Sequence, residues 1–491
     1  MRSIRTYLAL TALVALSACG GIGPQAPSST TPTQRTLVLD GKTMHRCGLY
    51  RMARCGRLKV PEDRGDPSGR EIGLDVMVIP AADPDPEPDP VFFLAGGPGS
   101  AATQVWWNAA DVFPRVHDHR DIVLVDQRGT GDSNPLLLPR FPDTTGMSAP
   151  VARATIAGSV RKGLARLDAD PNLYTSSVAA DDLDDVRAAL GYDRIDLYGA
   201  SYGATLAQYY VRRHERHVRA VVLDGGTLLD VPLFELLPAN SQRILEDVFD
   251  RCSADATCHA AFPDPAGELT TAIVRLRRHP VEVDVSGTGG NAPIVVDADA
   301  LADEIHHLLA VSDGARIPLL IHQAATGDLT PVAERILGTG TDAGGSTERL
   351  VMFWSIVCSE GWARFDPART AELGAGSYLL GSELEQARGV AAVCRAMPQA
   401  SLGPGDEAPV RSNVPVLLLN GAEDPQDPPS NVAEAPVELP NSLLVTIPGL
   451  GHTVGHLECC PELIAAFFEA GSVHGLDTSD IERLTPAPFV V

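Results

Sequence analysis

The sequence predicts an α/β protein with a mostly parallel central sheet, and two observations lead to this prediction. Short apolar runs that fit buried strands alternate with longer stretches of helical periodicity through much of the chain. This alternation stops near residue 228 and returns near residue 406, so we expect one long insertion to interrupt the sheet.

The composition is that of a globular protein. The chain has 491 residues, 44% of them hydrophobic and 21% charged, which is ample for a core and long for a single domain. A formal net charge of −24 argues against nucleic acid or anionic lipid headgroups as partners, because both would repel the protein. The acidity favours solubility, and it would also suit a site for a cationic group such as a free amine.

The N-terminus predicts export. Two arginines precede an apolar run at residues 7–16, which is too short to span a bilayer. The run leads into Leu16-Ser-Ala-Cys19, which resembles the cleavage motif of bacterial lipoproteins. We expect a signal peptide over residues 1–18, lipidation of Cys19 and a flexible tether over residues 19–35, which would anchor the protein in the bacterial cell envelope, on its periplasmic or extracellular face. A plain secretory signal with an incidental cysteine is the alternative.

Export permits disulfides. Eight cysteines besides Cys19 allow many pairings, so the sequence does not fix the connectivity. We expect Cys47–Cys55 and Cys252–Cys258 as local pairs, and Cys358–Cys394 as a third. No cysteine or histidine cluster has metal-ligand spacing, so the sequence predicts no metal and no cofactor.

The first strand-forming runs lie at residues 37–39, 58–60 and 72–79 and predict β-hairpin structure. A buried strand at 91–94 follows and runs into Gly-Gly-Pro-Gly at 96–99. Glycines directly after a central strand leave backbone N–H groups accessible to a substrate. We therefore expect Gly97, with Gly96 beside it, to donate to an oxyanion; a simple tight turn is the alternative.

The next buried strand, residues 122–125, ends in Asp-Gln-Arg-Gly-Thr-Gly-Asp-Ser at 126–133. We expect Asp126 and Arg128 to pair and to brace this turn. Residues 159–190 then have the periodicity of a helix that ends at Gly191.

The stretch from Ile195 to His214 predicts a strand, an abrupt turn and a helix. The turn, Gly199-Ala-Ser-Tyr-Gly203, matches G-x-S-x-G, the nucleophile elbow of α/β-hydrolases. Such a turn strains the residue at its tip, and flanking glycines let strand and helix approach closely. The sequence thus predicts Ser201 as a nucleophile at a helix N-terminus, with the N–H of Tyr202 as the other oxyanion donor.

After another strand at 219–223, residues 228–405 lack the strand pattern and predict several helices, among them 240–251, 298–310 and 370–397. Strands return at 414–419 and 443–447. We therefore divide the chain into a first part of the sheet domain at 36–227, a helical cap at 228–405 and a second part of the sheet domain at 406–491.

Asp424 and His452 each follow one of the two late strands, which is where parallel sheets place their functional groups. The order Ser201, Asp424, His452 is that of the α/β-hydrolase triad. A histidine can take the serine proton near neutral pH, and a carboxylate holds the imidazole in the required tautomer.

Neighbouring residues compete for two of these roles. His456 is the alternative to His452, which we prefer because it follows a glycine-rich turn. Glu423 and Asp427 are the alternatives to Asp424, which we prefer because the proline after it restricts the local backbone.

Four motifs together resemble the tripeptidyl/prolyl aminopeptidase family of secreted serine peptidases, and the similarity runs from about Cys55 to Leu484. They are Gly-Gly-Pro-Gly at 96–99, Asp-Gln-Arg-Gly-x-Gly-x-Ser at 126–133, Gly-x-Ser-Tyr-Gly at 199–203, and Asp424-Pro before the late Gly-His. The resemblance implies an α/β-hydrolase fold, a mostly parallel central sheet with a helical cap inserted between two late strands. It also implies a triad of Ser201, Asp424 and His452 and a cap that selects short peptides with a free N-terminus. Ala95 stands where prolyl iminopeptidases carry histidine.

The sequence therefore predicts an exported serine aminopeptidase, tripeptidyl- or prolyl-aminopeptidase-like, that cleaves short peptides through an acyl-enzyme. An acidic residue of the cap, Glu360, is the expected ligand of the substrate amine. A carboxylesterase or lipase with the same triad is the alternative, and a non-catalytic hydrolase-like surface protein is a further one.

Overall fold

A computed structural model of the protein describes residues 35–48, 52–142, 144, 147–285, 293–342, 350–403 and 405–491. The predicted signal peptide, Cys19 and nearly all of the tether lie outside the described residues. Within these ranges, no helix combines the length and the apolar character needed to cross a membrane.

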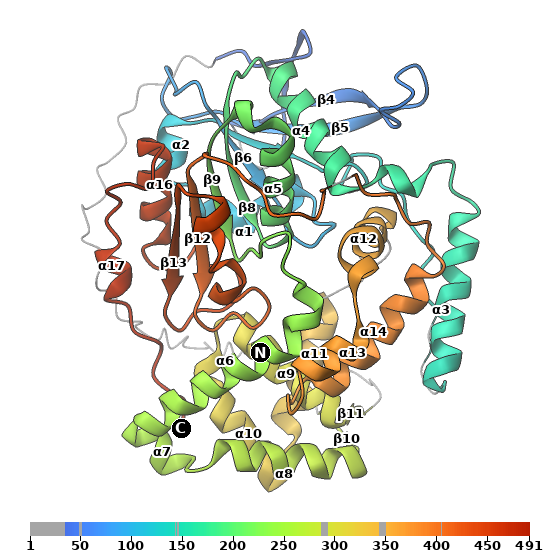
Figure 1. The fold of residues 1–491 in the computed structure, drawn as a ribbon, viewed down its shortest axis with the longest axis vertical. Coiled ribbons are helices and arrows are strands. Elements are labelled where there is room, and N and C mark those ends of the chain that lie inside the picture. The colour runs from blue at the N-terminus through green and yellow to red at the C-terminus, as the bar shows by residue number, and fades with distance from the viewer. Residues whose placement is uncertain are drawn as a thin grey trace, which may run out of the picture.

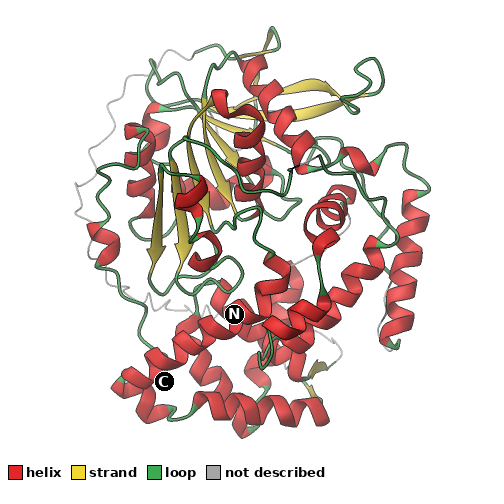
Figure 2. Cartoon of the chain, viewed as in Figure 1, coloured by secondary structure: helices red, strands yellow, loops and turns green. Residues whose placement is uncertain are grey.

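A nine-stranded sheet forms the centre of the fold (Figures 1 and 2). Its strand order is β13-β12-β9-β8-β6-β7-β5-β4-β3, and the six strands from β13 to β7 run parallel while β5, β4 and β3 pair antiparallel at one edge. This confirms the predicted mostly parallel sheet. The strands are β3 (His45–Arg46), β4 (Arg54–Pro61), β5 (Glu71–Ile79), β6 (Val91–Leu94), β7 (Ile122–Val125), β8 (Ile195–Ala200), β9 (Val218–Asp224), β12 (Val416–Gly421) and β13 (Ser442–Ile447). A separate two-stranded ribbon precedes them, β1 (Val38–Leu39) with β2 (Lys42–Thr43).

Helices cover both faces of the sheet, which is why β6 and β7 are apolar throughout. One face packs against α4 (Ser176–Leu190) and α5 (Tyr202–His214). The other packs against α1 (Ala102–Ala109), α2 (Val116–His119) and α16 (Cys460–Ala470), around a cluster of Phe93, Trp106, Phe113 and Tyr198. A last short helix, α17 (Ser479–Glu482), lies near the C-terminus.

One segment between β9 and β12, which we call the insertion, holds most of the remaining helices. Several of them enclose a core of their own, with Leu245, Leu276, Ile305 and Ile321 at its centre. Within the described residues its elements are α6 (Leu233–Ala254), α7 (Ala256–Ala261), α8 (Pro265–Arg278), β10 (Val281–Val283), β11 (Ile294–Val296), α9 (Ala298–Ala310), α10 (Ile317–Thr326), α11 (Thr330–Asp342), α12 (Val351–Ile356), α13 (Pro367–Leu373) and α14 (Leu380–Cys394). The boundaries at 228 and 405 stay a prediction.

Two predicted helices are each divided in the structure. The segment 159–190 contains the end of α3 (Ala149–Leu164) and the whole of α4, because Asp170 and Pro171 set a short separate turn between them. The segment 370–397 contains the end of α13 and all of α14, with Gly376 at a φ of 87° in the break. The hydrophobic periodicity of the sequence did not reveal either of these two breaks.

The three expected disulfides, Cys47–Cys55, Cys252–Cys258 and Cys358–Cys394, are all confirmed. The last of them ties the turn after α12 to the end of α14, so it fixes one wall of the insertion.

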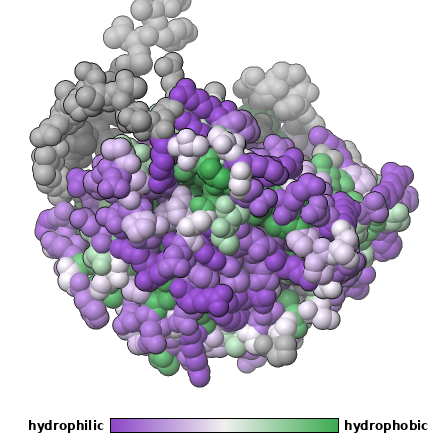
Figure 3. Space-filling view, turned by 90° about the horizontal axis from the view of Figure 1, so that it is seen from above, coloured by the Kyte–Doolittle hydropathy of each residue, from purple (hydrophilic) through white to green (hydrophobic). Residues whose placement is uncertain are grey.

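On the face drawn in Figure 3 most residues are hydrophilic, as the large net charge leads one to expect.

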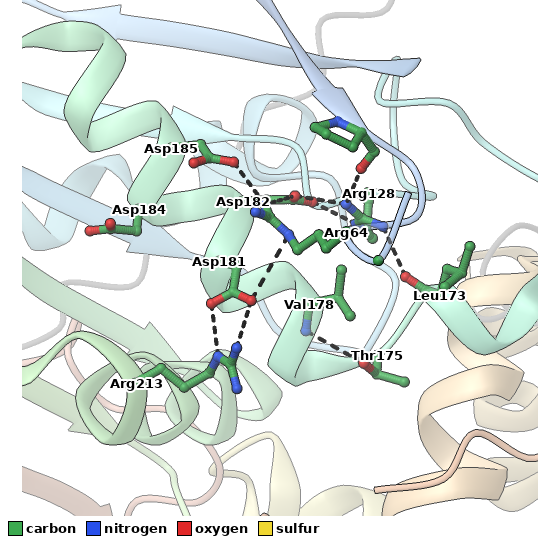
Figure 4. A network of polar contacts seen from close by, with 12 residues as sticks. Arg64, Arg128, Leu173, Thr175, Val178, Asp181, Asp182, Asp184, Asp185 and Arg213 are labelled. Carbon is green, nitrogen blue, oxygen red and sulfur yellow. Dashed lines mark hydrogen bonds and ion pairs between the residues drawn. The ribbon is translucent and has the colours of Figure 1, made fainter. Parts of the chain in front are cut away.

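The expected ion pair between Asp126 and Arg128 does not form. Arg128 is fully buried on the side of α4, where Nε and Nη2 donate to the Asp182 carboxylate at 2.6 and 2.7 Å (Figure 4). Asp126 instead accepts hydrogen bonds from the N–H and hydroxyl of Thr103, in the first turn of α1. The two side chains therefore tie the loop to helices on opposite faces of the sheet, and this double attachment holds it in place. Gln127 in the same loop donates to the hydroxyl of Tyr202, next to the predicted nucleophile.

Candidate active site

Ser201 lies at the tip of the sharp turn between β8 and α5, as the motif predicts. Its backbone has φ 55° and ψ −125°, a conformation that costs free energy in a residue other than glycine. A Cβ at position 199 would lie 2.3 Å from the carbonyl oxygen of Gly203, and one at position 203 would lie 2.0 Å from that of Leu94. Both flanking positions must therefore be glycine for strand, turn and helix to pack this closely.

The structure brings Ser201, His452 and Asp424 into one chain of hydrogen bonds. His452 Nε2 lies 2.9 Å from Ser201 Oγ, and His452 Nδ1 lies 2.9 Å from Asp424 Oδ2. Because an ionised carboxylate can only accept, Nδ1 carries the proton and Nε2 of the neutral ring is left to accept from the serine hydroxyl. Asp424 is fully buried, and its other oxygen accepts the backbone N–H groups of Gln426 and Asp427 at 2.9 Å.

The two acids that compete with Asp424, Glu423 and Asp427, make their hydrogen bonds and close ion pairs with other residues. Glu423 points to Arg251 of α6, with 2.7 Å between their charged atoms. Asp427 does face the histidine, but its carboxylate is 3.6 Å from Nδ1 and is held by Thr227 and Gln426. Asp427 is therefore a second negative charge beside the ring, while Asp424 makes the direct hydrogen bond.

A third carboxylate, that of Asp224 at the end of β9, supports the loop after His452. It is 1% exposed and accepts the N–H groups of Val454 and Gly455 at 2.7 and 3.0 Å and the hydroxyl of Tyr198. Its backbone carbonyl accepts the N–H of Ser201 at 2.9 Å. Asp224 thus attaches the elbow and the histidine loop to the same strand end, a role that sequence patterns did not indicate.

These charges set the basicity of the histidine. Burial by itself would lower the pKa of His452, but attraction to and hydrogen bonding with Asp424, together with the charges of Asp427 and Asp224, raise that pKa to about 9. Burial raises the pKa of Asp427 to about 6, against the opposing pull of the histidine.

Gly97 and Tyr202 both line the cavity onto which Ser201 opens. Tyr202 begins α5, so its N–H has no acceptor in the preceding turn of that helix. The glycine loop packs closely against Ser201, because a Cβ at Gly96 would lie 3.0 Å from Cβ of Ser201. The oxyanion donors remain a prediction that this arrangement supports.

The cavity has a volume of about 620 Å³ and lies between the sheet domain and the insertion. An aromatic wall, formed by Phe234, Trp362 and Phe365, lies on the insertion side. The rings of Trp362 and Phe365 stack with centroids 4.2 Å apart, and Phe234 packs edge-on against Trp362 at 5.4 Å.

Carboxylates dominate the titratable groups of the lining, which include a single arginine and a single histidine. Glu360 lines the cavity as expected, but its two oxygens already accept from the N–H and hydroxyl of Ser176 at 2.7 and 2.6 Å. Burial raises the pKa of Glu360 to about 7. The six acidic residues are Glu235, Asp303, Glu360, Glu383, Glu407 and Asp427.

Asp303 and Glu383 are lining residues that the sequence reasoning missed. Burial and the neighbouring charge of Asp303 raise the pKa of Glu383 to about 7. Among the described residues the Glu383 carboxylate has no hydrogen-bond or ion-pair partner. Asp303 and His306 lie three residues apart on α9, so a search of the predicted helix 298–310 for polar residues sharing one face would have found them.

Comparison with known proteins gives two matches to family models. A model described as alpha/beta hydrolase fold matches residues 89–259, and one described as TAP-like protein matches residues 383–480. Together they cover the strands and loops that carry all three residues of the hydrogen-bonded chain.

Curated relatives are peptidases by name. The chain is 27% identical to serine protease Hip1 of Mycobacterium tuberculosis over 237 residues, which is 44% of either chain. It is 29% identical to tripeptidyl aminopeptidase of Streptomyces lividans over 200 residues, 36% of either chain, and 30% identical to proline iminopeptidase of Neisseria gonorrhoeae over 29% of this chain and 34% of that one. The chain thus matches less than half the length of these relatives.

Solved structures show only remote likeness. Proline iminopeptidase of Mycobacterium smegmatis is 15% identical with a TM-score of 0.36, covering 85% of this chain and 98% of that one. A thermophilic esterase from Thermogutta terrifontis is 17% identical with a TM-score of 0.37, covering 85% and 100%. The first family model spans the strand, elbow and helix that present Ser201, and together with the mostly parallel sheet it shows that the chain has an α/β-hydrolase fold.

Proposed function

We propose that the protein is a serine peptidase that cleaves short peptides from a free N-terminus, as a tripeptidyl or prolyl aminopeptidase would. The observation that carries the proposal is the position of Ser201, hydrogen-bonded to His452, at the wall of a large cavity whose titratable groups are mostly acidic. The names of the curated relatives support it.

The geometry suits acyl transfer. Ser201 Oγ attacks the scissile carbonyl while His452 Nε2 takes its proton, and Asp424 stabilises the imidazolium. The N–H groups of Tyr202 and Gly97 hold the oxyanion. His452 then protonates the leaving amine, and water hydrolyses the acyl-enzyme by the same route.

The acidic lining would hold the ammonium group of the substrate. Glu360 was the residue expected for this, yet its oxygens are engaged with Ser176. We therefore assign the amine principally to Glu383, since an unpaired carboxylate at the wall of the cavity gains most from a bound cation. Asp303, which accepts from Ser382, is a second acidic group beside it. Glu360 adds negative charge behind Tyr202.

We also propose that the protein is exported and lipid-anchored through Cys19. The support is the predicted signal peptide and the three disulfides, which form in oxidising compartments. Metabolic labelling with a fatty-acid analogue, with and without Cys19→Ser, tests the anchor; equal labelling of both chains would refute it.

Hydrolysis of aminoacyl-, prolyl- and tripeptidyl-amides, each with a free and with an acetylated N-terminus, tests the activity. We expect the free substrates to be cleaved and the acetylated ones to be poor substrates. Equal rates for both sets would refute recognition of the amine. Activity on short acyl esters with none on any peptide would favour the esterase alternative, and Ser201→Ala, which removes the nucleophile, is the control.

A further inference from the structure

The turn that carries His452 is held by the insertion as well as by the sheet. The His452 N–H donates to the carbonyl oxygen of Ala310 at 2.8 Å, and the Gly451 N–H donates to Ser312 Oγ at 2.8 Å. A Cβ at Gly451 would lie 2.0 Å from the carbonyl oxygen of Leu309, so the turn is pressed directly against the end of α9.

The end of α9 is shaped for this contact. Ser312 follows the helix with φ 62°, a conformation that serine rarely adopts. The N–H of Asp313 folds back onto the carbonyl of Leu308 at 2.9 Å, which closes the helix end and leaves the Ala310 carbonyl to accept from His452. Two backbone donors of the catalytic turn thus find their acceptors in the insertion.

The same helix faces the substrate cavity. Asp303 and His306 of α9 line it, and His306 is fixed by a 2.9 Å hydrogen bond to Ser241 of α6. One helix therefore carries cavity-lining side chains along its length and the acceptors for the histidine turn at its end.

We propose that Ser312, at the end of α9, is a positioning residue that holds His452 at hydrogen-bonding distance from Ser201. This rests on the proposed function, because it assigns the insertion a part in aligning the same base. Without Oγ, the buried N–H of Gly451 loses its acceptor and the turn must shift to find another. A shift of about 1 Å at a reacting group can cost about 10²-fold in rate.

The experiment compares Ser312→Ala and Ser312→Gly with Ser377→Ala. The first two remove the same hydrogen bond, but only glycine relieves the strain at φ 62°. Ser377 is the matched control, because it is also a half-buried serine of the insertion that makes a 2.8 Å hydrogen bond, to the carbonyl of Pro238 away from the triad.

Two rates are measured: labelling of Ser201 by a small fluorophosphonate, and kcat and KM for the best peptide amide. We expect both Ser312 variants to lose about tenfold or more in labelling rate and in kcat, with KM within about twofold of wild type, as befits an interaction that aligns the base. Ser377→Ala should match the wild type.

Unchanged labelling and kcat in both Ser312 variants would overturn the inference while leaving the proposed function intact. So would full activity in Ser312→Gly alone, since backbone strain would then explain the alanine variant. A wild-type protein in which Ser201 does not react overturns the proposed function and this inference with it.

Discussion

Replacing Asp427 by asparagine should shift the pH dependence of the enzyme without removing the triad. The Asp427 carboxylate lies 3.6 Å from His452 Nδ1, whereas Asp424 makes the direct hydrogen bond at 2.9 Å. Asparagine keeps the shape of the side chain and removes its charge, so the perturbation is mainly electrostatic.

The magnitude follows from the distance. Two unit charges at this separation interact by about 1 kcal/mol in water and about 4 kcal/mol at an effective dielectric constant of 20. Since about 1.4 kcal/mol corresponds to one pKa unit, the pKa of His452 should fall by about one unit or more. His452 must be neutral to act as a base, so activity rises as the pH passes upward through its pKa. The wild-type acid limb should therefore lie well above pH 6.5, and Asp427→Asn should move it to lower pH.

The assay is kcat/KM of a peptide amide between pH 5 and 10. Thr227→Val is the control, because it removes a hydrogen bond to Asp427 but keeps both carboxylates, and its midpoint should stay close to that of the wild type. An acid limb that stays in place, or moves to higher pH, in Asp427→Asn would refute the electrostatic account of the site.

Three further predictions concern the elbow, the histidine loop and the acidic lining. Gly203→Ala should abolish activity and lower the melting temperature, because its Cβ would lie 2.0 Å from the Leu94 carbonyl; a soluble variant with wild-type kcat would contradict this. Asp224→Asn places an amide N–H group among the three donors that the carboxylate now accepts from, so kcat should fall about 10²-fold. Tyr198→Phe removes only one of these three hydrogen bonds and should lower kcat much less. An equal fall in kcat in the two variants would count against the role of Asp224. Glu383→Gln should raise KM for substrates with a free N-terminus about tenfold and leave acyl esters unaffected, and a parallel change for both would argue against amine binding.

The elbow and the hydrogen-bonded arrangement of Ser201, His452 and Asp424 could be predicted because each residue lies in a short, recognisable stretch of sequence. A strand, a glycine-flanked serine and a helix follow one another within twenty residues, and the close packing of strand and helix around Ser201 explains both glycines. Asp424 and His452 follow strands that proved to be neighbours, so chain order was enough to bring them together.

Contacts between distant segments could not be predicted in this way. Arg128 was paired with its neighbour Asp126, but a buried guanidinium needs several acceptors and finds them on α4 and in two loops. The hydrogen bond between Ser312 and Gly451 joins residues 139 positions apart. Glu383 and Asp303 meet only because α9 and α14 pack side by side. The Arg128 contacts depend on how α4 packs on the sheet and the other two on how the insertion packs, and local patterns encode neither.

The most direct test of the central claim is to react the protein with a fluorophosphonate and to map the adduct by mass spectrometry. The account predicts one adduct, on Ser201, that is lost in Ser201→Ala and formed far more slowly in His452→Ala, because the hydroxyl needs its base. An adduct at another serine, or labelling of Ser201 that does not depend on His452, would contradict it.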